Sequence, residues 1–129
     1  MSIANLPETA DTSYSAVLNY TGAVGVTGAC EVYGFLVGQW ATVFVKQLVA
    51  PITPLGTSSK IFIVDALPAY LRPSIQLQFP IVAVDNSANI LGVASFQTTG
   101  TIELFPAVSG FYTAATVGIL NFSVTYPLF

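Results

Sequence analysis

The chain of 129 residues contains no histidine, one cysteine and three cations, which are Lys46, Lys60 and Arg72. Charged residues make up 7% of it, against roughly 25% in an average soluble domain. Without an imidazole, a serine or cysteine nucleophile lacks its usual base, and a zinc or iron site lacks its commonest ligand. We therefore expect a protein that is not an enzyme and that carries no metal and no cofactor.

The shortage of cations and of cysteine excludes two further classes. Two lysines and one arginine cannot neutralise a row of phosphates, and the net charge is −3, so we expect no nucleic-acid binding. A single cysteine cannot form an internal disulfide. Cys30 lies at the start of an apolar run with no neighbouring cation, which indicates a small buried hydrophobic side chain and not a reactive thiol.

Apolar residues make up 53% of the chain, a surplus that must be kept from water. No run approaches the roughly 18 residues that a membrane helix requires, because Gln39, Thr42 and Lys46 interrupt residues 32–50. Residues 1–11 have neither the basic segment nor the apolar segment of a signal peptide. We expect a partner protein to cover the surplus, most simply another copy of the chain.

Short runs of alternating apolar and polar residues begin at residue 14, separated by glycine, proline, asparagine or serine. This pattern predicts one all-β domain over residues 14–129, preceded by a flexible N-terminal arm over residues 1–13. Eight to ten antiparallel strands of this kind fit a jelly-roll sandwich. The expected strands cover residues 14–18, 30–37, 40–48, 60–65, 75–84, 90–96, 101–105 and 119–126.

Turn residues mark several connections between these strands. Gly38-Gln39 has the length of a tight hairpin turn, and residues 85–89 indicate a longer hairpin loop. Asp85, Asn86 and Asn89 also offer oxygen ligands of the kind that calcium prefers, but turn chemistry accounts for them better. Residues 57–60 superficially resemble a serine–lysine dyad, yet a lysine between a polar loop and a strand is normally a solvated charge.

From residue 37 onward the sequence carries motifs in a recognisable order. A Val-Gly hairpin precedes the strand from Trp40, and a Leu-Pro-x-x-x-Arg-Pro corner covers residues 67–73. A Thr-Gly-x-Ile-x-Leu unit covers residues 99–104, and Ser-Val-Thr-Tyr closes the run at residues 123–126. This order resembles the trimeric jelly-roll heads at the ends of phage and large-virus fibres, which share the architecture of complement and tumour-necrosis-factor-like proteins. The resemblance covers residues 37–129.

The resemblance implies a homotrimer that serves as a non-enzymatic structural or surface protein of a virion, as a capsid, decoration, spike or fibre-head component. Such a protein would be made in the host cytoplasm and located on the capsid surface beside other virion proteins. Because Met1 lies close to the first expected strand, a short free-standing head is favoured over a long fibre. The alternative is a head domain that binds a host receptor or a carbohydrate and mediates attachment.

One expected strand has apolar residues on both faces, which indicates a subunit interface. Phe44 and Leu48 stand opposite Val43 and Val45, so one set must meet something outside the subunit. For the single tryptophan, Trp40, packing in the core and stacking on a ligand stay open as alternatives. The candidate interface residues are Trp40, Phe44, Leu48, Arg72 and Tyr126.

Arg72 and an aromatic pair are the remaining candidates. Arg72 could pair with Asp65 or Glu103, within or between subunits, or it could be a solvated loop charge. Phe111 and Tyr112 lie in a long loop region, where exposed aromatic rings could contact a sugar or a receptor. Packing beneath the loop is the alternative for this pair.

Overall fold

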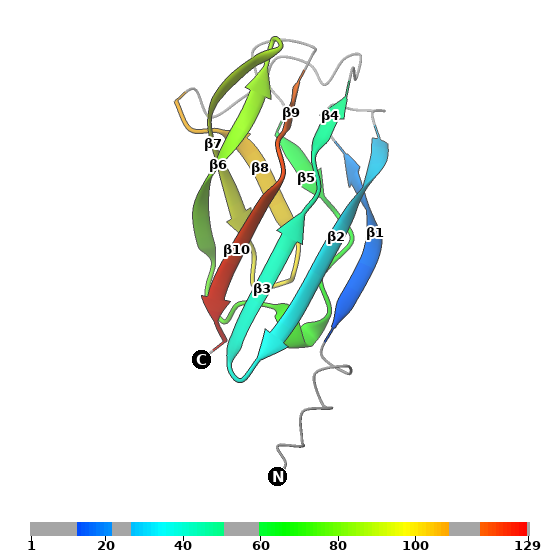
Figure 1. Ribbon diagram of the computed structural model, residues 1–129, viewed down its shortest axis with the longest axis vertical. Coiled ribbons are helices and arrows are strands. Elements are labelled where there is room, and N and C mark those ends of the chain that lie inside the picture. Colours follow the sequence, from blue (N-terminus) through cyan, green and yellow to red (C-terminus); the bar gives the residue numbers. More distant parts are fainter. Residues whose placement is uncertain (1–12, 22–26, 51–59, 109–116, 129) are drawn as a thin grey trace.

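The computed structural model describes residues 13–21, 27–50, 60–108 and 117–128, and its fold is all-β (Figure 1). One short 3₁₀ helix, η1 (Ala69–Leu71), lies between two of the strands. No helix in this part of the chain is long and apolar enough to cross a membrane. The strands are β1 (Tyr14–Thr21), β2 (Thr27–Val37), β3 (Trp40–Val45), β4 (Leu48–Ala50), β5 (Ile61–Ile63), β6 (Leu77–Asp85), β7 (Ala88–Phe96), β8 (Ile102–Pro106), β9 (Val117–Ile119) and β10 (Phe122–Pro127).

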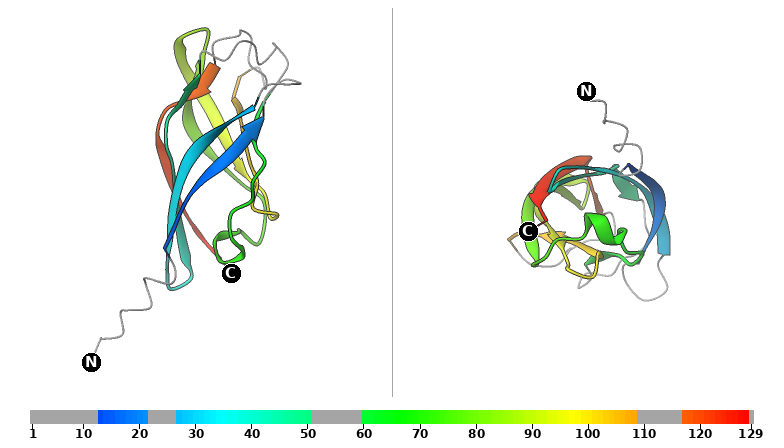
Figure 2. Two further views of the ribbon diagram at one scale, coloured as in Figure 1. Left: turned by 90° about the vertical axis from the view of Figure 1, so that its right-hand side faces the viewer. Right: turned by 90° about the horizontal axis from the view of Figure 1, so that it is seen from below.

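These ten strands form one antiparallel sheet in the order β10-β3-β2-β1-β5-β8-β7-β6-β9-β4. β4 follows β3 almost at once, and β10 follows β9, so each pair behaves as one long strand with an interruption. β10 pairs with β3, while β9 pairs with both β4 and β6. The sheet therefore curls round until its ends meet, and Figure 2 shows the resulting ring from below.

The chain winds through this ring as two Greek keys. β1, β2 and β3 are successive neighbours and β5 returns beside β1; β6, β7 and β8 repeat the pattern, and β9 returns beside β6. The expected all-β fold with eight to ten antiparallel strands is confirmed. A sandwich has two separate sheets, whereas here the interrupted strands β3–β4 and β9–β10 carry one sheet around the corner.

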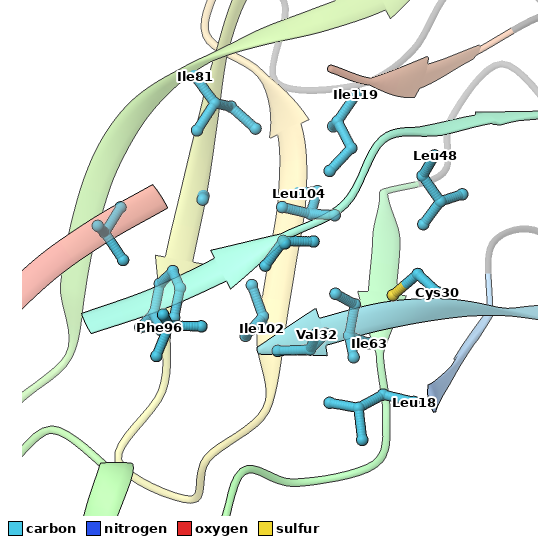
Figure 3. Close-up of a cluster of buried hydrophobic side chains, with 14 of the residues drawn as sticks. Leu18, Cys30, Val32, Leu48, Ile63, Ile81, Phe96, Ile102, Leu104 and Ile119 are labelled. Atoms are coloured by element: carbon cyan, nitrogen blue, oxygen red, sulfur yellow. The ribbon is translucent and has the colours of Figure 1, made fainter. Parts of the chain in front are cut away.

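Apolar side chains fill the interior of the ring (Figure 3). Alternation along each strand sends every second side chain inward, and burial of these side chains is the main source of stability. Cys30 packs among them, and burial raises the pKa of its thiol to about 11, which confirms a buried hydrophobic role. The largest fully buried side chains are Tyr126, Phe96, Ile61, Ile63, Leu67, Leu71, Ile102, Leu104, Ile119 and Val32.

Aromatic rings fill the seam where β10 and the first half of β6 face each other without pairing. The ladder between β6 and β9 begins only at Ala83. Below it, the Phe96 ring packs on Phe79 with centroids 5.5 Å apart, on Tyr126 at 5.6 Å and on Phe122 at 6.5 Å. Ring packing therefore joins the two halves of the sheet where backbone hydrogen bonds do not.

The Leu-Pro-x-x-x-Arg-Pro corner, which contains η1, closes the lower end of the ring (Figure 2). Leu67 and Leu71 are fully buried, and the Tyr126 hydroxyl donates to the carbonyl oxygen of Leu71. The guanidinium Nε of Arg72 donates to the Leu67 carbonyl at 2.8 Å. Gly34 of β2 leaves room for the corner, because a Cβ there would lie 2.8 Å from Leu71 Cδ1.

Two predicted turns have different outcomes. The tight turn between β2 and β3 is confirmed, and Gly38 adopts the positive φ of 61° that such turns require. The longer loop expected over residues 85–89 is wrong. β6 and β7 pair along their whole length, so Asn86 and Ser87 alone connect them, with φ of 56° and 63°.

Candidate interaction surface

Two neighbouring strands carry apolar side chains on their outer side as well as toward the core. In β2 the outward positions are the odd-numbered residues, and in β3 they are the even-numbered ones. The register aligns them in three rows, and β10 adds one residue to each row. We call this surface the aromatic face; it consists of the pairs Tyr33–Phe44, Phe35–Thr42 and Val37–Trp40 together with Ser123, Thr125 and Pro127 of β10.

Four side chains of the aromatic face are widely exposed. The exposed fractions are 38% for Tyr33, 47% for Phe35, 59% for Val37 and 51% for Trp40. The Tyr33 ring packs against the half-buried Phe44 ring, with centroids 6.1 Å apart. Single exposed apolar residues are common on soluble proteins, but a contiguous group of large ones marks an interaction surface.

Charge is confined to one edge of the aromatic face. Lys46 Nζ and Glu31 Oε2 form an ion pair at 3.2 Å, and the Tyr33 hydroxyl donates to Glu31 Oε1. This hydrogen bond and the Lys46 ammonium lower the pKa of Glu31, and the same bond raises the pKa of Tyr33. The hydroxyls of Thr42 and Thr125 bond to each other at 3.0 Å. The Tyr33 hydroxyl, the two charged groups and the two threonine hydroxyls of this surface are thus engaged with one another.

A smaller set of exposed apolar side chains lies on the outer side of β6 and β7. Val82 and Leu91 face each other across the ladder, with 44% and 57% of their surfaces exposed. A shallow depression of about 250 Å³ runs from Leu91 to Pro80 and Gln78. Its lining is almost entirely apolar, so it has few groups with which to orient a polar ligand.

The structure corrects two of the expected interface residues. Leu48 and Tyr126 are 5% and 1% exposed, so both belong to the core of the subunit and the interface expectation is wrong for them. Two consecutive exposed residues, 46 and 47, shift the alternation between β3 and β4 and turn Leu48 inward. Trp40 and Phe44 lie on the aromatic face, so core packing is wrong for Trp40, and their interface role stays a prediction.

Within the subunit, Arg72 pairs with neither of the carboxylates considered for it. Its Nε donates to a backbone carbonyl of its own corner. Glu103 instead pairs with Lys60 at 3.4 Å, which also corrects the view of Lys60 as a solvated charge. Asp65 accepts hydrogen bonds from the backbone and side-chain nitrogens of Asn19, both at 2.8 Å. A contact of Arg72 between subunits stays a prediction.

The other positions considered for chemistry do not assemble a site in the described part of the chain. Among the residues that the structure describes, no three His, Cys, Asp or Glu side chains gather as a metal ion would require. The segment from Asp85 to Asn89 is the hairpin turn and its flanks. Residues 57–59 and the candidate ligand contacts Phe111 and Tyr112 lie outside the described residues.

The fold of this chain is similar to that of a solved viral attachment protein. It is similar to the crystal structure of a reovirus attachment protein, sigma1, in complex with alpha-2,3-sialyllactose, with a TM-score of 0.52 and 15% sequence identity. The match covers 91% of this chain and 65% of the chain in that crystal structure, so this chain spans somewhat less than two thirds of the crystallised chain that it matches. The sequence matches no protein-family model and no curated protein sequence. The likeness shows a shared all-β fold and does not extend to the jelly-roll or tumour-necrosis-factor-like detail.

Proposed function

We propose that this chain is a non-enzymatic surface domain of a virion and that it works as a homotrimer in a capsid, decoration or spike position. The observation that carries the proposal is the fold, which matches a viral attachment protein over 91% of this chain. Because a fold alone hosts many functions, two features of the chain itself add support. It has an exposed aromatic face suited to assembly, and its sequence has no histidine to act as a base.

Oligomeric state and location in the particle test this proposal. Size exclusion with light scattering should give the mass of three chains of 13.6 kDa at micromolar concentration. The melting temperature should rise with protein concentration, since assembly stabilises the folded subunit. Mass spectrometry of purified virions should find the chain in many copies. A mass near one chain would reject the homotrimer, and absence from purified virions would reject the structural role.

The N-terminal arm is proposed to tether the domain to other virion proteins. Of residues 1–13, the structure describes Ser13, whose carbonyl accepts a hydrogen bond from the Tyr70 hydroxyl at 3.1 Å. Deletion of residues 1–12 should leave the circular dichroism spectrum and the oligomer mass unchanged while abolishing incorporation into particles. A truncated chain that does not fold would place this segment in the core.

Carbohydrate binding is a second candidate function. It is favoured by the sialyllactose that the reovirus attachment protein carries in its crystal structure. A glycan array probed with the purified protein, with alpha-2,3-sialyllactose among its sugars, tests this candidate. Binding that is lost in Tyr112→Ala and kept in Tyr70→Ala, the same substitution at an exposed tyrosine of the described part of the chain, would support it. Binding to no sugar on the array would reject it.

A further inference from the structure

We propose that a second copy of this chain binds to the aromatic face. This inference rests on the homotrimer proposed above and names the surface that holds the subunits together. In a closed ring of identical subunits larger than a dimer, each contact joins two different surfaces. Every contact in the trimer therefore includes one aromatic face, and a change in that face alters all contacts at once.

The extent of the aromatic face fits the apolar centre of a protein interface. An enclosed aromatic side chain buries roughly 150–250 Å². Tyr33, Phe35 and Trp40 keep between 38% and 51% of their surfaces exposed, so the three rings offer roughly 250 Å². Val37 and the outer atoms of the half-buried residues raise this to roughly 400–500 Å². A stable interface buries about 800 Å² per partner, of which somewhat more than half is apolar.

The charge of the aromatic face favours another copy over a charged partner. Its edge carries one anion and one cation, Glu31 and Lys46, which already pair at 3.2 Å. The face therefore presents no net charge that would repel a second copy or attract an oppositely charged molecule. Protein interfaces have this composition, with aromatic rings at the centre and charged groups at the rim.

The polar groups of the aromatic face favour a protein surface over a sugar. A site for a polar ligand places several polar groups so that they converge on it. Here the Tyr33 hydroxyl donates to Glu31, and the hydroxyls of Thr42 and Thr125 bond to each other. A sugar on this face would have to compete with these bonds, whereas an apolar surface of another copy leaves them in place.

Trp40 allows a test that needs no substitution. It is the single tryptophan of the sequence, and half of its surface is exposed in the subunit. We expect acrylamide to quench its fluorescence several-fold less in the assembled protein than in protein dissociated by dilution. The emission should also lie at shorter wavelength in the assembled protein. A trimer whose Trp40 is quenched equally in both states would overturn the assignment of the aromatic face.

A matched pair of substitutions separates the aromatic face from the exposed apolar side chains of β6 and β7. Phe35→Lys places a charge at the centre of the aromatic face and should weaken assembly by about 30-fold or more, the effect of losing one interface hot spot. Leu91→Lys places the same charge on β7, at a side chain that is exposed to a similar extent, and should leave assembly unchanged. Circular dichroism tests whether each variant is folded. If Phe35→Lys does not fold, acrylamide quenching of Trp40 in the wild-type protein tests the inference in its place.

Light scattering of the three proteins distinguishes the outcomes. A wild-type trimer that Phe35→Lys dissociates and Leu91→Lys does not would support the inference. Trimers in both variants, or dissociation by Leu91→Lys alone, would overturn the assignment of the face and leave the homotrimer standing. A wild-type monomer would overturn the homotrimer and this inference together. If that monomer binds a sugar on the array and Phe35→Lys abolishes the binding, the aromatic face is a carbohydrate-binding surface.

Discussion

The Tyr126 hydroxyl joins the last strand to the corner that closes the ring. Its O–H group donates to the carbonyl oxygen of Leu71, and both residues are fully buried. Burial raises the pKa of Tyr126 far above its usual value, so the hydroxyl stays protonated at every physiological pH. Tyr126→Phe keeps the ring and its packing against Phe96 but removes the donor. The substitution therefore isolates one buried hydrogen bond.

The cost of Tyr126→Phe follows from the site of the lost bond. A buried carbonyl that loses its partner costs about 1–3 kcal/mol of the free energy of unfolding. For a domain of this size, each kcal/mol lowers the melting temperature by about 3–6 °C. We expect a lower midpoint of urea unfolding with an unchanged m-value, when unfolding is monitored by circular dichroism. All samples need one protein concentration, because assembly also contributes to stability.

Tyr33→Phe is the matched control, since it removes the same group from an exposed site. The Tyr33 hydroxyl donates to Glu31, but water can replace it there. The change in the free energy of unfolding should stay within about 0.5 kcal/mol. Equal losses in the two variants would refute the reasoning, and so would a loss below about 0.5 kcal/mol in Tyr126→Phe.

Two further predictions concern the β6–β7 turn and the buried thiol. Ser87→Gly should stabilise the protein by up to about 1 kcal/mol, because Ser87 has a φ of 63° and asparagine–glycine is a preferred two-residue turn; a lower melting temperature would contradict this. The pKa of Cys30 is raised from 9.0 to about 11, so at pH 8 the folded protein should react with a thiol reagent about 100-fold more slowly than the unfolded protein. The higher pKa belongs to the folded state, so the contribution of Cys30 to stability is complete below pH 9.0 and is lost as the pH rises toward 11. The midpoint of urea unfolding, measured as a function of pH, should therefore fall over this range.

The sequence was sufficient to predict the strands where only one face of a strand is apolar. In β10, Val124 and Tyr126 are buried while Ser123 and Thr125 are exposed, as alternation requires. Two long expected strands are interrupted, at residues 46–47 and 120–121. Those interruptions depend on where the sheet turns its corner, which is set by contacts between distant strands and leaves no mark in local alternation.

The aromatic face could not be predicted in the same way, because β2 is apolar on both sides. Phe35 is exposed while Leu36 beside it is half-buried, and hydropathy alone does not tell which of them faces the core. Pairing with β3 decides the question, since it brings Phe35 beside Thr42 on the outer side. The available signal was the spacing of Tyr33 and Phe35, two aromatic residues on one side of a strand.

The distribution of exposed apolar residues explains where the apolar surplus of the composition lies. The interior of the ring takes up one side of each strand. The outer positions are mixed: Gln78 of β6 and Glu103 of β8 are polar, whereas Val17 of β1 and Val82 of β6 are exposed apolar residues. A surplus that was merely tolerated would be scattered singly over the surface. On β2 and β3, by contrast, large side chains align in register across two adjacent strands, as in the rows Tyr33–Phe44 and Val37–Trp40. Contact with a second copy would remove these rows from water and so reconcile 53% apolar residues with a single small core.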